Sequence, residues 1–144
     1  MSDDIYQMDL LRLAGDAHGH GRLTSPTASV TADNPLCGDR VTLDLEVTDG
    51  KISAIGHEVK ACLLCQASAS LLGRHAPGRT VAELHEAAAS VAAMLRQPDA
   101  TELPPGWSGI ESLKPAARIR SRHACVLLPF RALTEALEKA ARKE

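Results

Sequence analysis

The sequence predicts an α+β fold, in which a small antiparallel sheet of about three strands is covered by helices. Residues 40–48 alternate apolar and polar side chains, as a half-buried strand does. Asp49-Gly50 follows directly and is the strongest short signal for a hairpin. Most segments with the spacing of helices come after this hairpin, and grouped strands followed by grouped helices are typical of α+β proteins.

Each element has its own signal. A first helix is expected over residues 4–15, where Ile5, Met8 and Leu11 are spaced as on a helix and Gly15 can end it. Residues 15–26 are rich in glycine and polar side chains, including His18 and His20, and predict a mobile linker. A short strand over 27–32 should pair with 40–48, and 51–61 should be the returning strand of the hairpin.

The second half of the chain is expected to be helical. The first of these helices begins at Cys62 and ends at Gly73. A helical insertion at about 77–97 follows, opened by the capping-box pair Thr80 and Glu83. A proline-rich loop over 98–109 leads through a short helical piece to a last amphipathic helix with basic residues near its C-terminus. Trp107 should anchor the loop on the core.

Composition limits the function classes. The 144 residues fit one domain, 1–144, and its core must be aliphatic because aromatics make up only 2%. The net charge of −2 is spread over interspersed charges, which argues against a nucleic-acid or membrane-surface partner. The acidic N-terminus carries no signal-peptide pattern, so a cytoplasmic protein is expected. In that reducing compartment, cysteines are metal ligands or reactive thiols rather than disulfides.

Three cysteines fall where predicted elements end. Cys37 lies in the turn before the strand at 40–48, Cys62 at a junction of strand and helix, and Cys125 at the start of the last helix. Such positions converge at one end of a sheet, and helix N-termini favour thiolates. Asp39 can add an oxygen ligand. Three thiolates and one carboxylate predict a tetrahedral zinc site.

Two nearby residues are assigned to other roles. Cys65 follows Cys62 by one helical turn and is interpreted mainly as a small core residue. His123 stands two residues before Cys125 and is a candidate supporting or exchange ligand. Arg118, Arg120 and Arg122 are interpreted as a solvated face.

The stretch "NPLCGDRVTLDLEVTDGKISAIGHEVKACLLCQASASLL" resembles the core of the NifU-like iron–sulfur cluster assembly proteins of the IscU and SufU type. The shared pattern is a Cys-Gly-Asp turn, a hairpin, and a cysteine followed by a small-residue helix. The resemblance spans about residues 27–140. It implies that Cys37, Asp39, Cys62 and Cys125 bind the metal, or that the three cysteines bind an iron–sulfur cluster.

Within this family the chain is most similar to the SufU type. It has the helical insertion, and Arg122 stands three residues before Cys125, which is preceded by Ala124 where IscU-type chains have a histidine. This resemblance implies a zinc-binding sulfur acceptor that takes persulfide sulfur from a cysteine desulfurase of the SufS type. Cys37 is the expected acceptor, because its turn should be the most mobile of the three cysteine settings. A scaffold for a [2Fe-2S] cluster is the alternative.

Two other classes compete with this interpretation. A strand leading into Cys62-x-x-Cys65 at a helix start is how thioredoxin-like redox proteins place their dithiol, although that fold needs a parallel βαβ unit. A structural zinc domain that binds nucleic acid would need a basic patch and aromatic platforms, which the sequence lacks.

Overall fold

The computed structural model describes residues 2–36 and 38–143 and has the predicted α+β architecture. Three strands form an antiparallel sheet in the order β1-β2-β3. Their bounds are Ala28–Asn34 for β1, Asp39–Thr48 for β2 and Lys51–Lys60 for β3. The helices are α1 (Ser2–Asp16), α2 (Leu63–His75), α3 (Val81–Arg96) and α4 (His123–Lys143), with 3-10 helices η1 (Ile110–Arg118) and η2 (Arg120–Arg122) before α4.

The hairpin between β2 and β3 turns where the sequence predicts. Asp49 and Gly50 both have positive φ, at 54° and 77°, as a type I′ turn requires. The turn pairs Thr48 with Lys51, and the register shifts by one residue between Glu46 and Val47. A turn that matches the twist of the strands therefore sets which side chains of the hairpin face the helices.

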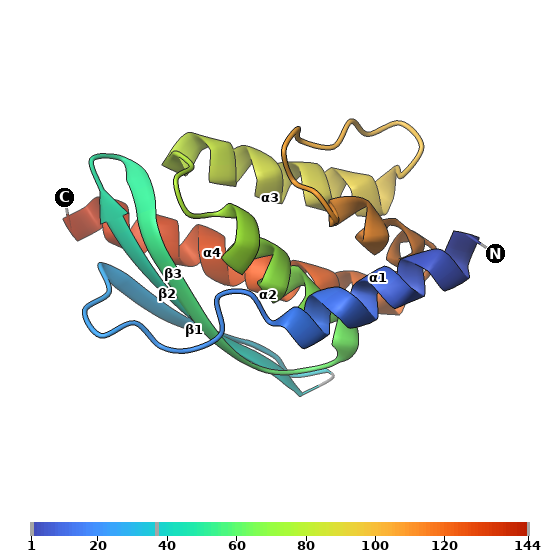
Figure 1. Cartoon of the computed structure of the whole chain (residues 1–144), viewed down its shortest axis with the longest axis horizontal. Coiled ribbons are helices and arrows are strands. Elements are labelled where there is room, and N and C mark those ends of the chain that lie inside the picture. Colours follow the sequence, from blue (N-terminus) through green and yellow to red (C-terminus); the bar gives the residue numbers. More distant parts are fainter. Residues whose placement is uncertain (1, 37, 144) are drawn as a thin grey trace.

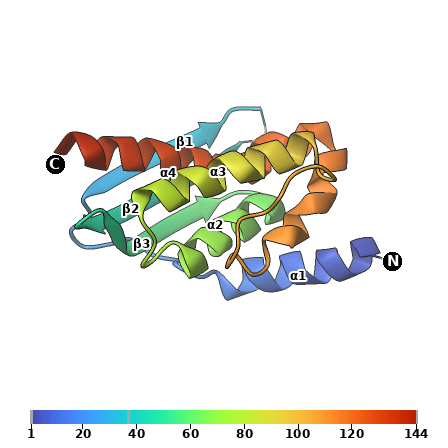
Figure 2. The ribbon, with the colours of Figure 1, turned by 90° about the horizontal axis from the view of Figure 1, so that it is seen from above.

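Helices lie on one face of the sheet. Figure 1 shows α4 and α2 crossing that face: α4 packs on β1 and β2, and α2 packs on β3 and on α4. Viewed from above in Figure 2, α3 lies beside α4, while α1 lies on the other side of α2 and contacts it. The core between the layers is aliphatic, with Leu43, Leu71 and Leu133 completely buried.

Asp44 departs from the predicted alternation of β2. It lies on the polar face of the strand, yet it is fully buried because residues 22 and 23 cross that face. The Arg22 guanidinium lies 2.7 Å from the Asp44 carboxylate, and the Leu23 amide and the Ser29 hydroxyl also donate to it. Burial alone would raise the pKa of Asp44, but these hydrogen bonds outweigh burial and hold the pKa below its usual range.

Two other local predictions are wrong for related reasons. The second helix continues past Gly73 to His75, so this glycine does not end the helix. The linker is not free, since His20 and Gly21 pair with His57 of β3. Both differences arise because the linker packs directly on α2 and β3, a contact between distant parts of the chain.

The later elements follow the sequence closely. The Thr80 hydroxyl accepts from the Glu83 amide and the Glu83 carboxylate accepts from the Thr80 amide, which confirms the capping box. Trp107 is buried and anchors the loop, as predicted. Arg118, Arg120 and Arg122 are exposed.

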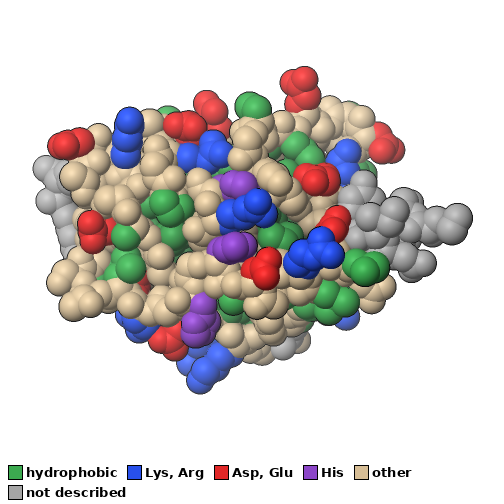
Figure 3. Space-filling view, viewed as in Figure 1, with side chains coloured by type: hydrophobic (Ala, Val, Ile, Leu, Met, Phe, Trp, Pro, Cys, Tyr) green, Lys and Arg blue, Asp and Glu red, His purple; other side chains and the backbone are tan. Residues whose placement is uncertain are grey.

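The face of the molecule that Figure 3 presents carries no large patch of charges of one sign. Basic and acidic side chains are interspersed there, and several histidines gather near its middle. Among residues 2–36 and 38–143, no helix combines the length and the apolar character needed to cross a membrane.

Candidate metal centre

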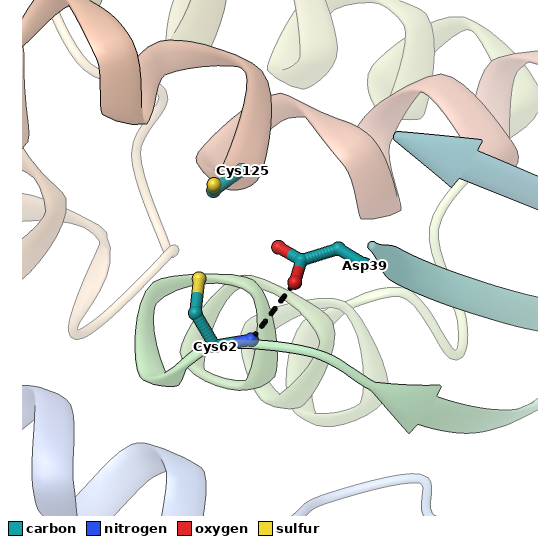
Figure 4. Close-up of side chains that lie close together, drawn as sticks. All are labelled: Asp39, Cys62 and Cys125. Carbon is teal, nitrogen blue, oxygen red and sulfur yellow. Dashed lines mark hydrogen bonds between the residues drawn. The ribbon is translucent and has the colours of Figure 1, made fainter. Parts of the chain in front are cut away.

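Three of the four predicted ligands come together from three elements. Asp39 begins β2, Cys62 is the N-cap residue of α2, and Cys125 lies in the first turn of α4. A carboxylate oxygen and the two sulfur atoms all lie within 4.8 Å of one another. Figure 4 shows the three side chains directed toward a common space between the strand and the two helices.

The Asp39 carboxylate has one oxygen in use and one without a partner. Its Oδ1 accepts a hydrogen bond from the Cys62 amide at 3.2 Å. Its Oδ2 is buried and has no hydrogen-bond partner among the described residues. A buried carboxylate oxygen with no partner is costly, and a bound cation would remove that cost. This oxygen is the strongest local indication that the site receives a positively charged ligand.

The two thiols differ in access. Cys125 is buried, whereas Cys62 is partly exposed. The Cys62 side chain makes no capping hydrogen bond with its helix, so the thiol is directed to the site and not to the backbone. Cys62 also lines a groove of 690 Å³ together with residues of α1, α2 and η1. Approach to the centre from that side therefore passes the Cys62 sulfur.

Cys37, the fourth predicted ligand, lies outside the described residues. Only Gly38 separates it from Asp39 in the sequence. The chain on both sides is held by Asn34, whose side chain accepts from the Leu36 amide at 3.2 Å and whose carbonyl accepts from the Gly38 amide at 2.9 Å. Gly38 has φ +75°, a conformation that glycine adopts without strain.

Asn34 was not singled out from the sequence, although a signal was present. Asparagine before proline at the end of a strand favours a turn in which the side chain bonds the backbone two residues on. Here the Asn34 side chain accepts from the Leu36 amide and the Asn34 carbonyl from the Gly38 amide. Asn34 is therefore a structural residue of the loop that carries Cys37.

The donor set fits zinc. Thiolate sulfur and one carboxylate oxygen are ligands that Zn²⁺ accepts in four-coordinate sites. The described part of the set supplies two sulfur atoms and the unpartnered Asp39 oxygen at mutually compatible distances. The same thiols also suit iron–sulfur clusters, so the donor set alone does not choose between the two occupants.

The other candidates lie apart from this centre. Cys65 is fully buried in the hydrophobic core, as the sequence suggests. His123 donates from Nε2 to the Ala117 carbonyl at 2.9 Å and does not belong to the group of converging ligand atoms. The thioredoxin-like alternative is contradicted, because the strand before Cys62 belongs to an antiparallel hairpin and not to a parallel βαβ unit.

Known proteins are similar to this chain in sequence and in fold. The family model for the NifU-like N terminal domain matches residues 5–114, which include Cys37, Asp39 and Cys62. The iron–sulfur cluster assembly scaffold protein IscU of Thermotoga maritima is 28% identical over 138 residues, which are 96% of each chain.

Solved structures agree with this assignment. The N-terminal NifU-like protein of Brucella abortus has a TM-score of 0.91 and 35% identity, covering 99% of this chain and 98% of that one. A protein of Fervidobacterium islandicum AW-1, described as an iron–sulfur cluster assembly scaffold for the SUF system (SufU), has a TM-score of 0.82 and 25% identity, covering 95% and 99%. The resemblance found in the sequence is thus confirmed: the chain belongs to the NifU-like N terminal domain family.

Proposed function

We propose that this protein serves iron–sulfur cluster assembly as a zinc-binding sulfur acceptor, with Cys37 receiving persulfide sulfur from a cysteine desulfurase. The observation that carries the proposal is the buried Oδ2 of Asp39, which has no hydrogen-bond partner among the described residues and lies beside the sulfur atoms of Cys62 and Cys125. Membership of the NifU-like family supports the assembly role, and the fold neighbour described as SufU supports the zinc-binding type.

In this proposal Asp39, Cys62, Cys125 and Cys37 hold the zinc. When bound, zinc supplies positive charge that keeps the thiols deprotonated. Cys62 and Cys125 are attached to the first turns of α2 and α4, while Cys37 sits on the loop that Asn34 shapes. The proposal makes Cys37 the ligand that leaves and acts as a nucleophile, because the sequence places it in a turn next to Gly38.

The transfer itself is a thiol exchange without net oxidation. The Cys37 thiolate attacks the outer sulfur of the persulfide on the desulfurase cysteine. The sulfur–sulfur bond of the donor breaks, a new one forms on Cys37, and the donor cysteine leaves as a thiolate. Asp39 occupies a ligand position without adding a thiol that could compete for the incoming sulfur.

A second candidate function is a scaffold on which a [2Fe-2S] cluster is built as cargo. The observation that favours it is the relative from Thermotoga maritima, which is named a scaffold and is aligned over 96% of this chain. In that role Cys37, Cys62 and Cys125 would supply thiolates to iron. The two candidates use the same residues and differ in what those residues hold.

The test runs the protein with a cysteine desulfurase and cysteine, then locates added sulfur by mass spectrometry of non-reduced peptides. Sulfur on Cys37 is expected. Sulfur on Cys125 with none on Cys37 would overturn the acceptor assignment. Metal analysis and an absorbance spectrum of protein purified without oxygen decide between the two functions: colourless protein with about one zinc per chain supports the acceptor, and the visible absorption of a cluster supports the scaffold.

A further inference from the structure

Residues 17–21, which join α1 to the rest of the chain, lie in a slot that two glycines make possible. A Cβ added to Gly73 of α2 would collide with the carbonyl of His18, and one added to Gly56 of β3 would collide with the carbonyl of Gly21. Gly19 of the segment also packs closely against Gly73, since a Cβ added to Gly19 would lie 2.7 Å from the Gly73 Cα. Backbone meets backbone here, so a side chain on either wall would expel the segment.

His57 fastens the segment in this slot. Its carbonyl accepts from the Gly21 amide at 2.8 Å, and its amide donates to the Gly19 carbonyl at 3.0 Å. Its ring Nε2 donates to the His18 carbonyl at 2.7 Å, because a carbonyl can only accept. From α2, the Ser70 hydroxyl accepts from the His18 amide at 3.0 Å. We call residues 17–21 with these contacts the latch.

The helix held by the latch packs on α2 and η1. Within residues 7–16 of α1, Leu10 and Leu13 are the two buried side chains, and they pack where α1 meets α2 and η1. Met8 and Leu11 are largely exposed, at 63% and 54%. The latch adds backbone hydrogen bonds and close glycine packing at the C-terminal end of α1, so it contributes to what keeps the helix in place.

α1 forms one wall of the groove beside the metal centre. Gln7 and Leu10 line the groove of 690 Å³ from the side of α1, and Cys62 and Leu63 line it from the side of α2. Figure 4 shows Cys62 at the start of α2, with a helix end of the N-terminal colour on the side away from Asp39. The position of α1 therefore affects how open the groove beside Cys62 is.

We infer that α1 is a movable wall over the Cys62 side of the centre and that the latch determines whether this wall is closed or open. Once its contacts are released, the latch can itself serve as a hinge, because Ala17, Gly19 and Gly21 within it all have positive φ, at 44°, 81° and 117°. Opening would widen the groove without moving Asp39 or Cys125, which are attached to β2 and α4. The use of this α1 movement in sulfur transfer rests on the proposed function, but the movement itself does not.

Two variants loosen the latch to different degrees. Gly73→Ala places a methyl group against the His18 carbonyl and should expel the segment. Ser70→Ala removes one hydrogen bond and adds no bulk, so it tests the latch even if Gly73→Ala fails to fold. Gly15→Ala is the matched control, because its Cβ would meet no atom within 4 Å.

The readouts are hydrogen exchange in the full chain as purified and iodoacetamide labelling of Cys62, located by peptide mass spectrometry. In Ser70→Ala, residues 7–16 should exchange and Cys62 should react about three- to tenfold faster, the effect of losing one hydrogen bond. Gly73→Ala should increase both rates by a larger factor, while hydrogen exchange in α3 stays at the wild-type rate in both variants.

Three results would overturn the inference: unchanged α1 exchange in Ser70→Ala, faster α1 exchange with unchanged Cys62 labelling, or an equal effect of Gly15→Ala. Failure of the wild-type chain to take sulfur on Cys37 would instead refute the proposed function. The exchange and labelling results do not depend on sulfur transfer, so the two failures are distinguishable.

Discussion

The amide of Cys62 donates a hydrogen bond to Oδ1 of Asp39 across 3.2 Å, which ties the start of α2 to the start of β2 at the candidate metal centre. The same carboxylate leaves its Oδ2 buried and without a partner among the described residues. One oxygen thus organises the site while the other remains available to a ligand. Replacing Asp39 should therefore weaken zinc binding, while it leaves the stability of the zinc-free protein unchanged or raises it.

Asp39→Asn should weaken zinc binding at least about tenfold, because the amide retains an acceptor for Cys62 but loses the charge. Zinc-free Asp39→Asn should be as stable as the zinc-free wild type, or up to about 1 kcal/mol more stable, since a buried uncompensated charge is removed. Urea unfolding with and without a chelator measures both effects. Equal loss of stability in the two conditions would show that Asp39 is purely structural.

Cys65→Ser should keep about one zinc per chain, whereas Cys62→Ser and Cys125→Ser should lose most of it. The physical reason is the phase of α2, which directs Cys65 into the hydrophobic core and Cys62 toward Asp39. Placing a hydroxyl in that core should cost Cys65→Ser about 1–3 kcal/mol of stability. Metal analysis separates the two classes of variant. Zinc retained in Cys62→Ser would contradict the ligand set.

Trp107→Ala should destabilise the protein by about 3–5 kcal/mol, the usual cost of deleting a buried indole. The ring is 3% exposed, lies 5.3 Å from the His75 ring, and has the Arg79 guanidinium 4.9 Å from its centroid. Chemical unfolding measures the loss.

Arg79→Lys is the finer test of the same loop. Arg79 donates to the Gly106 carbonyl at 2.9 Å and to the His75 carbonyl at 2.8 Å, and a lysine cannot make both bonds. A loss of about 1–2 kcal/mol is expected even though the charge is kept. The fluorescence of the single tryptophan reports whether the loop has moved. Wild-type stability in Arg79→Lys would mean that the charge alone holds the loop.

Stability should fall as the pH drops below about 6.5, partly through His57. Burial lowers the pKa of His57 below its ordinary value of 6.5, and the nearby His20 lowers it further, although the His18 and Ala69 carbonyls act in the other direction. Below pH 6.5 the unfolded chain therefore binds a proton that the folded chain does not, which favours unfolding. The stabilising contribution of neutral, buried His57 is complete above the pKa that His57 has in the unfolded chain. It is lost as the pH falls from that value toward the lower pKa of the folded protein.

His57→Gln should show a smaller fall in unfolding free energy between pH 7.5 and 5.5 than the wild type, measured in urea. Each proton contributes at most about 1.4 kcal/mol per pH unit. The slope should not vanish, because burial also lowers the pKa of His75. An identical slope in His57→Gln and wild type would show that the pKa of His57 does not differ between the folded and the unfolded chain.

Much of the fold was predictable because its signals are local. The strand over 40–48, the Asp49-Gly50 turn and the Thr80 capping box each depend on neighbours in sequence, and each is found where predicted. The convergence of Asp39, Cys62 and Cys125 also followed from a local feature, their position at the ends of elements. The residue pattern around Cys37, Asp39 and Cys62 was sufficient to indicate the family.

Other features depended on contacts between distant segments. Asp44 is on the polar side of its strand by alternation and is buried only because Arg22 and Leu23 cross it. Gly73 resembles a helix end in sequence, but its missing side chain makes room for His18. The sequence alone therefore indicated most of the elements and which residues are candidate ligands. The tertiary structure decided which polar groups are buried and how α1 is held beside Cys62, because burial depends on which remote segment covers a residue and local sequence carries no record of that choice.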